Sequence, residues 1–262
     1  MLIHPILFPA TYAGFALAEQ LFPAVPLLRV KRWRVKGLIF FALGGVYNSL
    51  LPALWHDHIG SLRLMNLSAL GTIGGAIAAL FTLDFVNYFW HRARHRVPLL
   101  WRIFHQMHHS AERLDVPGAM YSHPMDQLAG AMLGSFAATV IGVTPDAAAL
   151  TGYVMFVLSC LQHVNIKTPR ALGYFIQRPE SHSVHHARGV HAHNYAAFPI
   201  IDMLFGTFKN PSERAPLAGF WDGASAELGS LLAARDVSRP PSAEHGQSAA
   251  PSIGQLATEE PG

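Results

Sequence analysis

Long apolar stretches, each close to the length of a membrane-crossing helix, dominate this chain. A spanning helix needs about 20 mostly apolar residues, because its backbone polar groups must be satisfied within the segment. The fourth and fifth stretches are joined by the tight turn 144–146, which predicts a helical hairpin, and the fourth is short enough to be partly re-entrant. Five helices are predicted, over residues 6–28, 37–55, 67–90, 127–143 and 147–163.

The overall composition points the same way. Hydrophobic residues make up 51% of the chain and charged residues only 13%, whereas soluble domains carry about 25% charged residues. This excludes an ordinary soluble enzyme, a disordered chain and a coiled coil. The net charge of +3 comes from scattered arginines, so we expect no nucleic-acid partner. The fold class predicted is an all-α, polytopic membrane domain with four to five spans.

The basic residues predict the orientation of these helices. Five basic residues lie between the first two stretches and five arginines follow the third, whereas the loop before the third carries only Arg63. By the positive-inside rule, the basic loops and everything after residue 163 face the cytosol. The N-terminus has neither a charged region nor a clear cleavage site, so we expect a retained span. The chain is thus predicted to be a multi-pass integral membrane protein, in the plasma or inner membrane if it is bacterial.

Histidine is the residue that suggests a chemistry. The chain has 16 histidines, as many as Asp and Glu together, and twelve lie between positions 91 and 193. Spacings of three and four residues place side chains on one helical face, where two can hold one metal ion or three can hold two. Asp84 and Tyr88 continue the first group backwards along the same face. The three groups, which we call boxes, are His91 and His95; His105, His108 and His109; and His182, His185 and His186.

The number of histidines favours two metal ions. Imidazole suits Zn, Cu, Fe and Ni alike, but a zinc ion uses only three or four protein ligands. The eight box histidines, with His163 as a ninth, exceed that number, whereas two six-coordinate ions would absorb them and leave positions for oxygen. His123 is either a ligand or a structural hydrogen bonder. His191 and His193 are expected in a loop, at the surface or supporting the ligands, and the isolated His56 and His58 are expected to be interfacial polar residues.

The motifs between residues 84 and 207 resemble the fatty acid hydroxylase/sterol desaturase superfamily of membrane di-iron enzymes. The resemblance leaves the first two spans unmatched. Ser183, His193 and Ala196 depart from residues common in that family, which leaves the substrate subgroup open. The matching motifs are Asp84-x3-Tyr88-x2-His91-Arg92-x2-His95, Leu100-Trp101-x3-His105-x2-His108-His109-Ser110, His123-Pro124, His163-x-Asn165, His182-x2-His185-His186, Asn194-Tyr195 and Asp202-x2-Phe205-Gly206-Thr207.

The resemblance implies a helical membrane domain with a cytosolic cap in which histidines hold two iron ions. Such an enzyme uses O2 and two electrons to hydroxylate or desaturate a C–H bond of a lipid, such as a sterol, fatty acyl chain or carotenoid. The sequence has no dinucleotide-binding motif after a strand and no haem domain, so a separate ferredoxin- or cytochrome b5-type electron donor is expected. The implied ligands are His91, His95, His105, His108, His109, His163, His182, His185 and His186, with His123 as a weaker candidate.

Further residues receive supporting roles. Asp84, Asn165, Asn194 and Asp202 are candidates for fixing the histidine tautomers through the outer ring nitrogens. Trp101, Phe104 and Tyr121 either line a lipid channel or anchor the chain at the membrane interface. The domains expected are 1–66 (membrane helices), 67–210 (catalytic), 211–235 (C-terminal segment) and 236–262, a Pro-, Ser- and Ala-rich tail predicted to be disordered.

Two other function classes stay open. A zinc-dependent membrane hydrolase would need a glutamate base beside its histidines; no box contains His-Glu-x-x-His, and Glu112 and Glu180 are the only nearby candidates. A metal transporter would place its ligands in the middle of the membrane and not at the cytosolic ends of the helices.

Overall fold

The computed structural model describes residues 4–240, apart from the side chains of residues 53–57. Within this part the regular secondary structure is helical, and the only β pairing is an isolated bridge between Ala187 and Ala218. The predicted all-α class is therefore confirmed.

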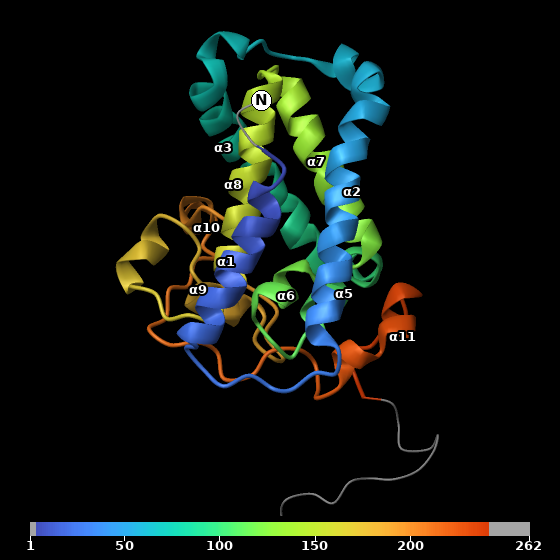
Figure 1. Ribbon diagram of the computed structural model, residues 1–262, viewed down its shortest axis with the longest axis vertical. Coiled ribbons are helices and arrows are strands. Elements are labelled where there is room, and N and C mark those ends of the chain that lie inside the picture. Colours follow the sequence, from blue (N-terminus) through green and yellow to red (C-terminus); the bar gives the residue numbers. More distant parts are fainter. Residues whose placement is uncertain (1–3, 241–262) are drawn as a thin grey trace, which may run out of the picture.

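Five long helices run roughly along the long axis of the molecule (Figure 1). Within this bundle α3 packs on α8, and α2 packs on α7. The five helices are α1 (Leu7–Leu21), α2 (Trp33–Ile59), α3 (Gly71–Arg96), α7 (Pro124–Ile141) and α8 (Pro145–His163).

The helices match the five predicted stretches, with shifted ends. The first ends at Leu21, seven residues before its predicted end, ahead of a segment that contains Pro23 and Pro26, which disfavour helix continuation. The predicted hairpin is present: Gly142 ends α7 with a left-handed φ of 66°, and Thr144 caps α8. The helix α3 continues beyond its predicted end at residue 90 to Arg96 and carries the first histidine box on its last turns.

Short helices form a cap at one end of the bundle, opposite the connection between α2 and α3 (Figure 1). The boundary predicted at residue 236 falls inside this cap, because Val237 is buried and its N–H donates to Gln106. Residues 241–262 of the predicted tail lie outside the described part. The short helices are α4 (Pro98–Leu100), the π-helical turn η3 (Trp101–His105), α5 (Gln106–His109), α6 (Val116–Met120), α9 (Pro179–His185), α10 (Pro199–Leu204) and α11 (Leu228–Leu232), with 3₁₀ turns η1 (Gly60–Leu62), η2 (Ser68–Leu70), η4 (Arg170–Tyr174) and η5 (Ala224–Ala226).

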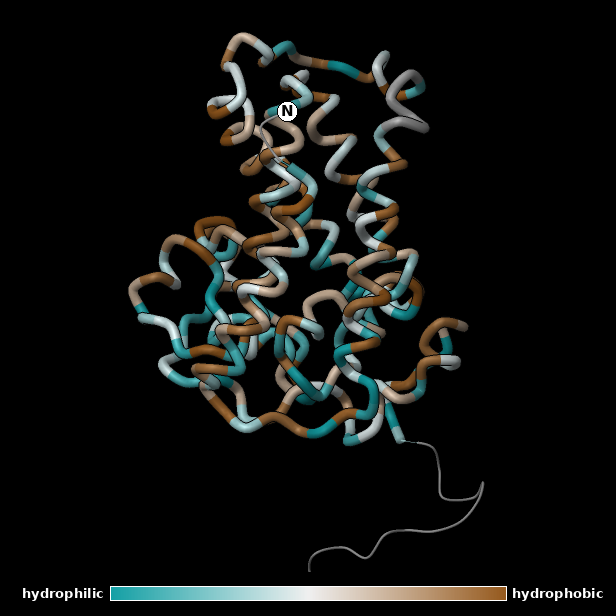
Figure 2. Tube along the Cα trace, in the orientation of Figure 1, coloured by the Kyte–Doolittle hydropathy of each residue, from teal (hydrophilic) through white to brown (hydrophobic). Residues whose placement is uncertain are grey.

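The long helices expose apolar side chains outward. In the described residues two segments are long and apolar enough to cross a membrane, Trp33–Pro52 and Ser68–Arg96, and only 11% and 28% of their apolar windows are buried. Hydrophobic positions recur along the whole bundle, while hydrophilic positions are concentrated in the cap (Figure 2). A helix in a soluble core would bury these side chains, so the exposure supports association with a membrane. The count of four to five spans stays a prediction.

The base of α2 is held tightly against the cap. The indole N–H of Trp33 donates to Asp115 at 2.8 Å, just before α6. A Cβ added at Gly37 would lie 2.7 Å from Pro117 Cα. Glycine at position 37 therefore allows a backbone-to-backbone contact that no other residue permits.

We expect Gly37→Ala to lower the free energy of unfolding by about 1–3 kcal/mol, as overpacking does in other tightly packed interiors. The matched control is Gly45→Ala in the same helix, where nothing lies within 4 Å of the added Cβ; it should be neutral or stabilise by up to ~1 kcal/mol through helix propensity. Thermal unfolding of the detergent-solubilised protein measures both. Equal melting temperatures for the two variants would show that α2 and α6 do not depend on this contact.

Candidate metal centre

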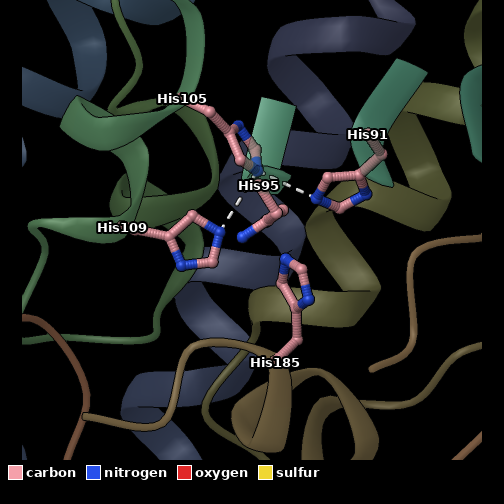
Figure 3. A group of neighbouring side chains, drawn as sticks. All are labelled: His91, His95, His105, His109 and His185. Carbon is pink, nitrogen blue, oxygen red and sulfur yellow. Dashed lines mark hydrogen bonds between the residues drawn. The ribbon is translucent and has the colours of Figure 1, made fainter. Parts of the chain in front are cut away.

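Nine histidines converge in two groups where α3 and α8 meet the cap. In each group, one ring nitrogen from every member lies within 4.8 Å of those of the others. Figure 3 shows the first group, with rings from three separate segments pointing toward a common centre. Group 1 contains His91, His95, His105, His109 and His185, and group 2 contains His108, His163, His182 and His186. These are the nine residues predicted as ligands; that they bind metal stays a proposal.

The spacing within each box decides which group a histidine joins. His105 and His109, four residues apart, belong to group 1, while the intervening His108 belongs to group 2. In the third box His182 and His186 are the pair four residues apart, and they belong to group 2, while His185 joins group 1. Each H-x-x-H-H box therefore contributes to both groups, because residues i and i+4 share a helical face.

A π-helical turn adjusts the register of the second box. The N–H of Gln106 donates to the carbonyl of Trp101, five residues earlier, which defines η3 and places His105 at its end. Single π turns are uncommon inside helices and occur frequently at functional sites. The sequence pattern gave no sign of this turn.

The two histidine groups are in direct contact. The ring of His109 in group 1 stacks on that of His186 in group 2, with ring centroids 4.1 Å apart and an interplanar angle of 13°. His105 and His108 also lie side by side, with centroids 5.5 Å apart. Two ions held by these groups would therefore be neighbours and could act on one substrate.

In group 2, two unprotonated nitrogens face each other. His108 Nδ1 donates to the carbonyl of Tyr121 at 3.3 Å, and His163 Nδ1 donates to that of Ser159 at 2.8 Å. A carbonyl only accepts, and a neutral imidazole carries one N–H. Both Nε2 atoms are therefore lone pairs, yet they lie 3.2 Å apart. A cation between them removes this conflict.

The same conflict occurs in group 1. His91 Nδ1 donates to the carbonyl of Tyr195 at 2.8 Å, and His105 Nδ1 lies 3.5 Å from the Asp126 carboxylate, which also pairs with Arg94. The Nε2 atoms of His91 and His105 then face each other at 2.8 Å. His95 and His185 each leave a buried Nε2 without a hydrogen-bond partner in the described part of the chain.

Protons are poorly suited to relieve these contacts. Burial, followed by the neighbouring His163, lowers the pKa of His108 well below its ordinary value. Burial likewise lowers the pKa of His185 to about 3. Neutral imidazole is the form that binds metal ions. The buried donor set therefore fits two cations of a metal that accepts nitrogen ligands.

A strained loop over residues 191–195 supports group 1. His191, His193 and Asn194 all have left-handed backbone, with φ of 42°, 69° and 48°, which is uncommon for residues other than glycine. The loop nevertheless places three partners against outer nitrogens of ligands: His191 Nδ1 lies 3.1 Å from His109 Nδ1, His193 O accepts from His185 at 2.7 Å, and Tyr195 O accepts from His91. Strain of this kind is characteristic of functional sites.

The four residues predicted to contact outer ring nitrogens bind backbone groups instead. Asp202 accepts from the N–H groups of Tyr195 and Ala196, and Asp84 accepts from those that follow, each at 2.8 to 2.9 Å. Asn194 bonds Ser181 O, Lys209 O and Lys209 N, and Asn165 bonds the backbone of Val25. The predicted direct contact is thus corrected: Asp84, Asn194 and Asp202 hold the backbone that in turn contacts the histidines.

One supporting residue, Asp126, was not recognised in the sequence, and the role of another, His191, was left open between the surface and support of the ligands. Asp126 supports His105, and its only sequence signal is an acid at the start of an apolar stretch. His191 was expected in a loop, without a specific partner. His123 lies outside both groups, because its Nδ1 accepts from Met125 N and its Nε2 donates to Leu232 O.

The aromatic residues predicted to line a channel differ in position. Trp101 packs against the rings of His95, His109 and His191. Tyr121 is fully buried and its hydroxyl donates to Ser225 O, within a core that contains Trp33. Phe104 packs edge-on against Trp90. None of the three lines the cavity beside the histidines.

A comparison of the sequence with known protein families matches the region that contains the histidine boxes. The family model described as fatty acid hydroxylase matches residues 76–207, which is half of the chain. The chain belongs to the fatty acid hydroxylase family. The resemblance inferred from the motifs is confirmed, and the match contains all nine grouped histidines.

Named relatives of this chain act on different lipids, by their descriptions. It is 30% identical over 149 residues to a sphingolipid C4-hydroxylase of Schizosaccharomyces pombe, covering 53% of this chain and 49% of the relative. It is 28% identical over 232 residues to a cholesterol 25-hydroxylase-like protein of Danio rerio, covering 78% and 89%. An ornithine lipid hydroxylase of Rhizobium tropici is 31% identical over 139 residues, covering 52% and 42%. The chain thus spans about half the length of most of these relatives. No solved structure gives a significant match.

Removing one ligand should change the number of metal ions bound. We expect His108→Ala to reduce bound metal from two ions per chain to about one. Group 2 would keep three of its four imidazoles and lose the one whose Nε2 faces that of His163. His58→Ala, at an exposed position of α2, is the matched control and should keep both ions. Elemental analysis of the purified protein counts the metal. Unchanged content in His108→Ala would exclude group 2 as a site.

Asparagine substitutions at His191 and His193 distinguish the effect of the His191 ring on metal binding from the effect of the strained loop backbone. Asparagine tolerates left-handed backbone but is too short to reach His109. His191→Asn should weaken metal binding about 10- to 100-fold, the usual effect of losing an outer partner. His193→Asn keeps the carbonyl that accepts from His185 and should leave binding unchanged. Metal affinity measured by competition with a chelator tests both, and equal affinities would remove His191 from the site.

Proposed function

We propose that this chain is a membrane di-iron oxygenase that hydroxylates a C–H bond of a lipid. The observation that carries the proposal is the pair of neighbouring imidazole groups in which unprotonated Nε2 atoms face each other at 2.8 and 3.2 Å. Five and four neutral nitrogen ligands suit two ions of high coordination number. The hydroxylases among its relatives support this reaction over desaturation.

Iron is favoured over zinc by the ligand number and by the family. Zinc has no redox chemistry and is satisfied by four ligands or fewer. Two iron ions would supply the activation of O2, with one oxygen atom entering the lipid C–H bond and the other leaving as water after uptake of two electrons and two protons. A separate ferredoxin- or cytochrome b5-type protein is proposed as the electron donor.

A zinc hydrolase is the weaker alternative because neither candidate base is free. Glu112 accepts from the N–H groups of Gly223 and Ser225 and from the Ser225 hydroxyl. Glu180 accepts from Thr168 and pairs with Arg178 at 3.2 Å, with both side chains almost fully buried. A metal transporter is disfavoured because the histidines lie at the cap end of the long helices.

A cavity beside the histidines offers a place for the substrate. It has a volume of about 240 Å³, and both groups contribute to its wall, which also includes Met155 and Ala196. Pockets that hold a whole drug-sized ligand usually measure about 300–1,000 Å³. Only a segment of a lipid therefore enters, while the rest stays with the membrane. The walls position the C–H bond and exclude water, which is the protein's share of cofactor chemistry.

The proposed orientation has the cap in the cytosol. The basic segments 29–36 and 92–102 lie toward the cap end of the bundle, whereas the connection between α2 and α3 lies at the opposite end (Figure 1). That connection contains Arg63. This asymmetry agrees with the positive-inside rule. We propose a multi-pass protein whose metal centre faces the cytosol, where a soluble electron donor can reach it.

The reaction is tested by expressing the protein in host cells grown under ¹⁸O2 and analysing lipid extracts by mass spectrometry. We expect lipids that carry one hydroxyl labelled from O2, present with the wild type and with His58→Ala. His186→Ala should abolish them, because group 2 loses one of its four ligands. Unchanged lipids, with the protein expressed and loaded with two irons, would contradict the proposed oxygenase. Labelled lipids with His186→Ala at wild-type level would contradict the proposed centre.

A further inference from the structure

Four polar side chains line the cavity without making any hydrogen bond within the described part of the chain. Elsewhere in the wall, Arg94 pairs with Asp126, and Gln177 donates to Asn194 O and Ala196 O, while the proposed ligand His182 leaves a buried Nδ1 without a partner in the described part of the chain. The unengaged residues are Asn87, Ser122, Ser159 and Gln162.

These side chains have a definite position relative to the proposed ligands. Asn87 precedes His91 by four residues on α3, and Ser159 precedes His163 by four residues on α8. Gln162 directly precedes His163. Four residues of helix rise by about 6 Å, so Asn87 and Ser159 lie about one helical turn before His91 and His163. That length corresponds to only a few carbon–carbon bonds of a substrate.

Polar side chains between apolar helices are costly unless they have partners. They usually bond across the helix interface, but these four do not, although α3 and α8 pack closely. A purely hydrocarbon segment in the cavity would leave all of them unsatisfied. A substrate group that donates and accepts hydrogen bonds would satisfy them.

The charges of the cavity wall further restrict the chemistry of the substrate group that could bind there. The charged side chains of the cavity are Arg94 and Asp126, and they neutralise each other. Among the described wall side chains no charge is left unpaired, so only the proposed metal ions themselves would attract a charged group. The unengaged groups are an amide pair and two hydroxyls, which match a neutral partner.

We propose that the substrate carries a neutral hydrogen-bonding group, a hydroxyl or an amide, within a few bonds of the carbon that is hydroxylated, and that Asn87 and Gln162 bind it. This inference rests on the proposed function and specifies its substrate class. It distinguishes the chain from an oxygenase that acts far along an unsubstituted hydrocarbon chain. Ser122 and Ser159 complete the polar wall.

The test compares octadecan-1-ol with octadecane, two probes that differ only in one hydroxyl. The iron-loaded full-length protein in nanodiscs receives both probes in equal amounts, a chemical reductant and ¹⁸O2. We expect label to enter octadecan-1-ol at least tenfold more than octadecane, at carbons near the hydroxyl. A tenfold preference is the effect of about one well-made hydrogen bond.

Asn87→Leu and Gln162→Met keep the approximate size of each side chain and remove its hydrogen bonds. Each should reduce the preference about tenfold and scatter the label along the chain, with two irons still bound. Asn48→Leu is the matched control: this exposed side chain on α2 bonds only Gly44 O, and its removal should leave the preference unchanged. A second readout is binding itself, measured as the rise in unfolding temperature that octadecan-1-ol gives beyond octadecane, which should disappear in Asn87→Leu and Gln162→Met.

The outcomes separate this inference from the proposed function. Equal labelling and equal stabilisation by the two probes would overturn the inference and leave the oxygenase intact. A preference that survives in both variants would also overturn it, because other residues would then recognise the hydroxyl. Absence of label from both probes in the iron-loaded wild type would contradict the proposed function, while the binding measurement would still decide whether the cavity prefers the hydroxyl.

Discussion

The structure is organised around buried imidazoles whose unprotonated nitrogens face each other, a contact that a metal cation would make favourable. Backbone carbonyls and Asp126 hold the protons of four histidines on Nδ1, so their Nε2 lone pairs point at one another across 2.8 and 3.2 Å. Burial depresses the pKa of His108 and His185, so protonation does not replace the cation. Metal binding would therefore be coupled to folding of the cap, because the proposed ligands come from α3, η3, α5, α8 and α9 and the metal would join them.

The cap acts as the support for this arrangement. Asp84 on α3 and Asp202 on α10 bind four consecutive N–H groups over residues 195–198. That segment continues the loop over residues 191–195. Two carbonyls and the His191 ring of this loop contact the outer nitrogens of three proposed group 1 ligands. In a buried carboxylate, acceptance of two or more N–H bonds offsets the cost of removing the charge from water. Asp84 and Asp202 thus position the histidines indirectly, by holding the backbone that contacts them.

Much of the architecture could be predicted because each signal was local. The apolar stretches predicted the five helices, and the spacing of three and four residues singled out the eight box histidines, to which His163 was added as a ninth. The errors concern contacts between distant segments. Asp84 and Asp202 were singled out in the sequence, but with the wrong partners: those of Asp84 lie more than 100 residues away, and those of Asp202 lie in the irregular segment just before α10. The π turn at Trp101–His105 and the left-handed loop at His191 depend on the assembled centre and leave no pattern in the sequence.

Anomalous X-ray scattering at the iron absorption edge, from crystals of protein purified from iron-supplemented cells, tests the central claim most directly. A di-iron centre predicts two peaks per chain. One should be enclosed by the Nε2 atoms of His91, His105 and their group 1 partners, and the other by those of His108, His163 and their group 2 partners. A single peak, or no peak with the same rings still facing each other, would contradict it.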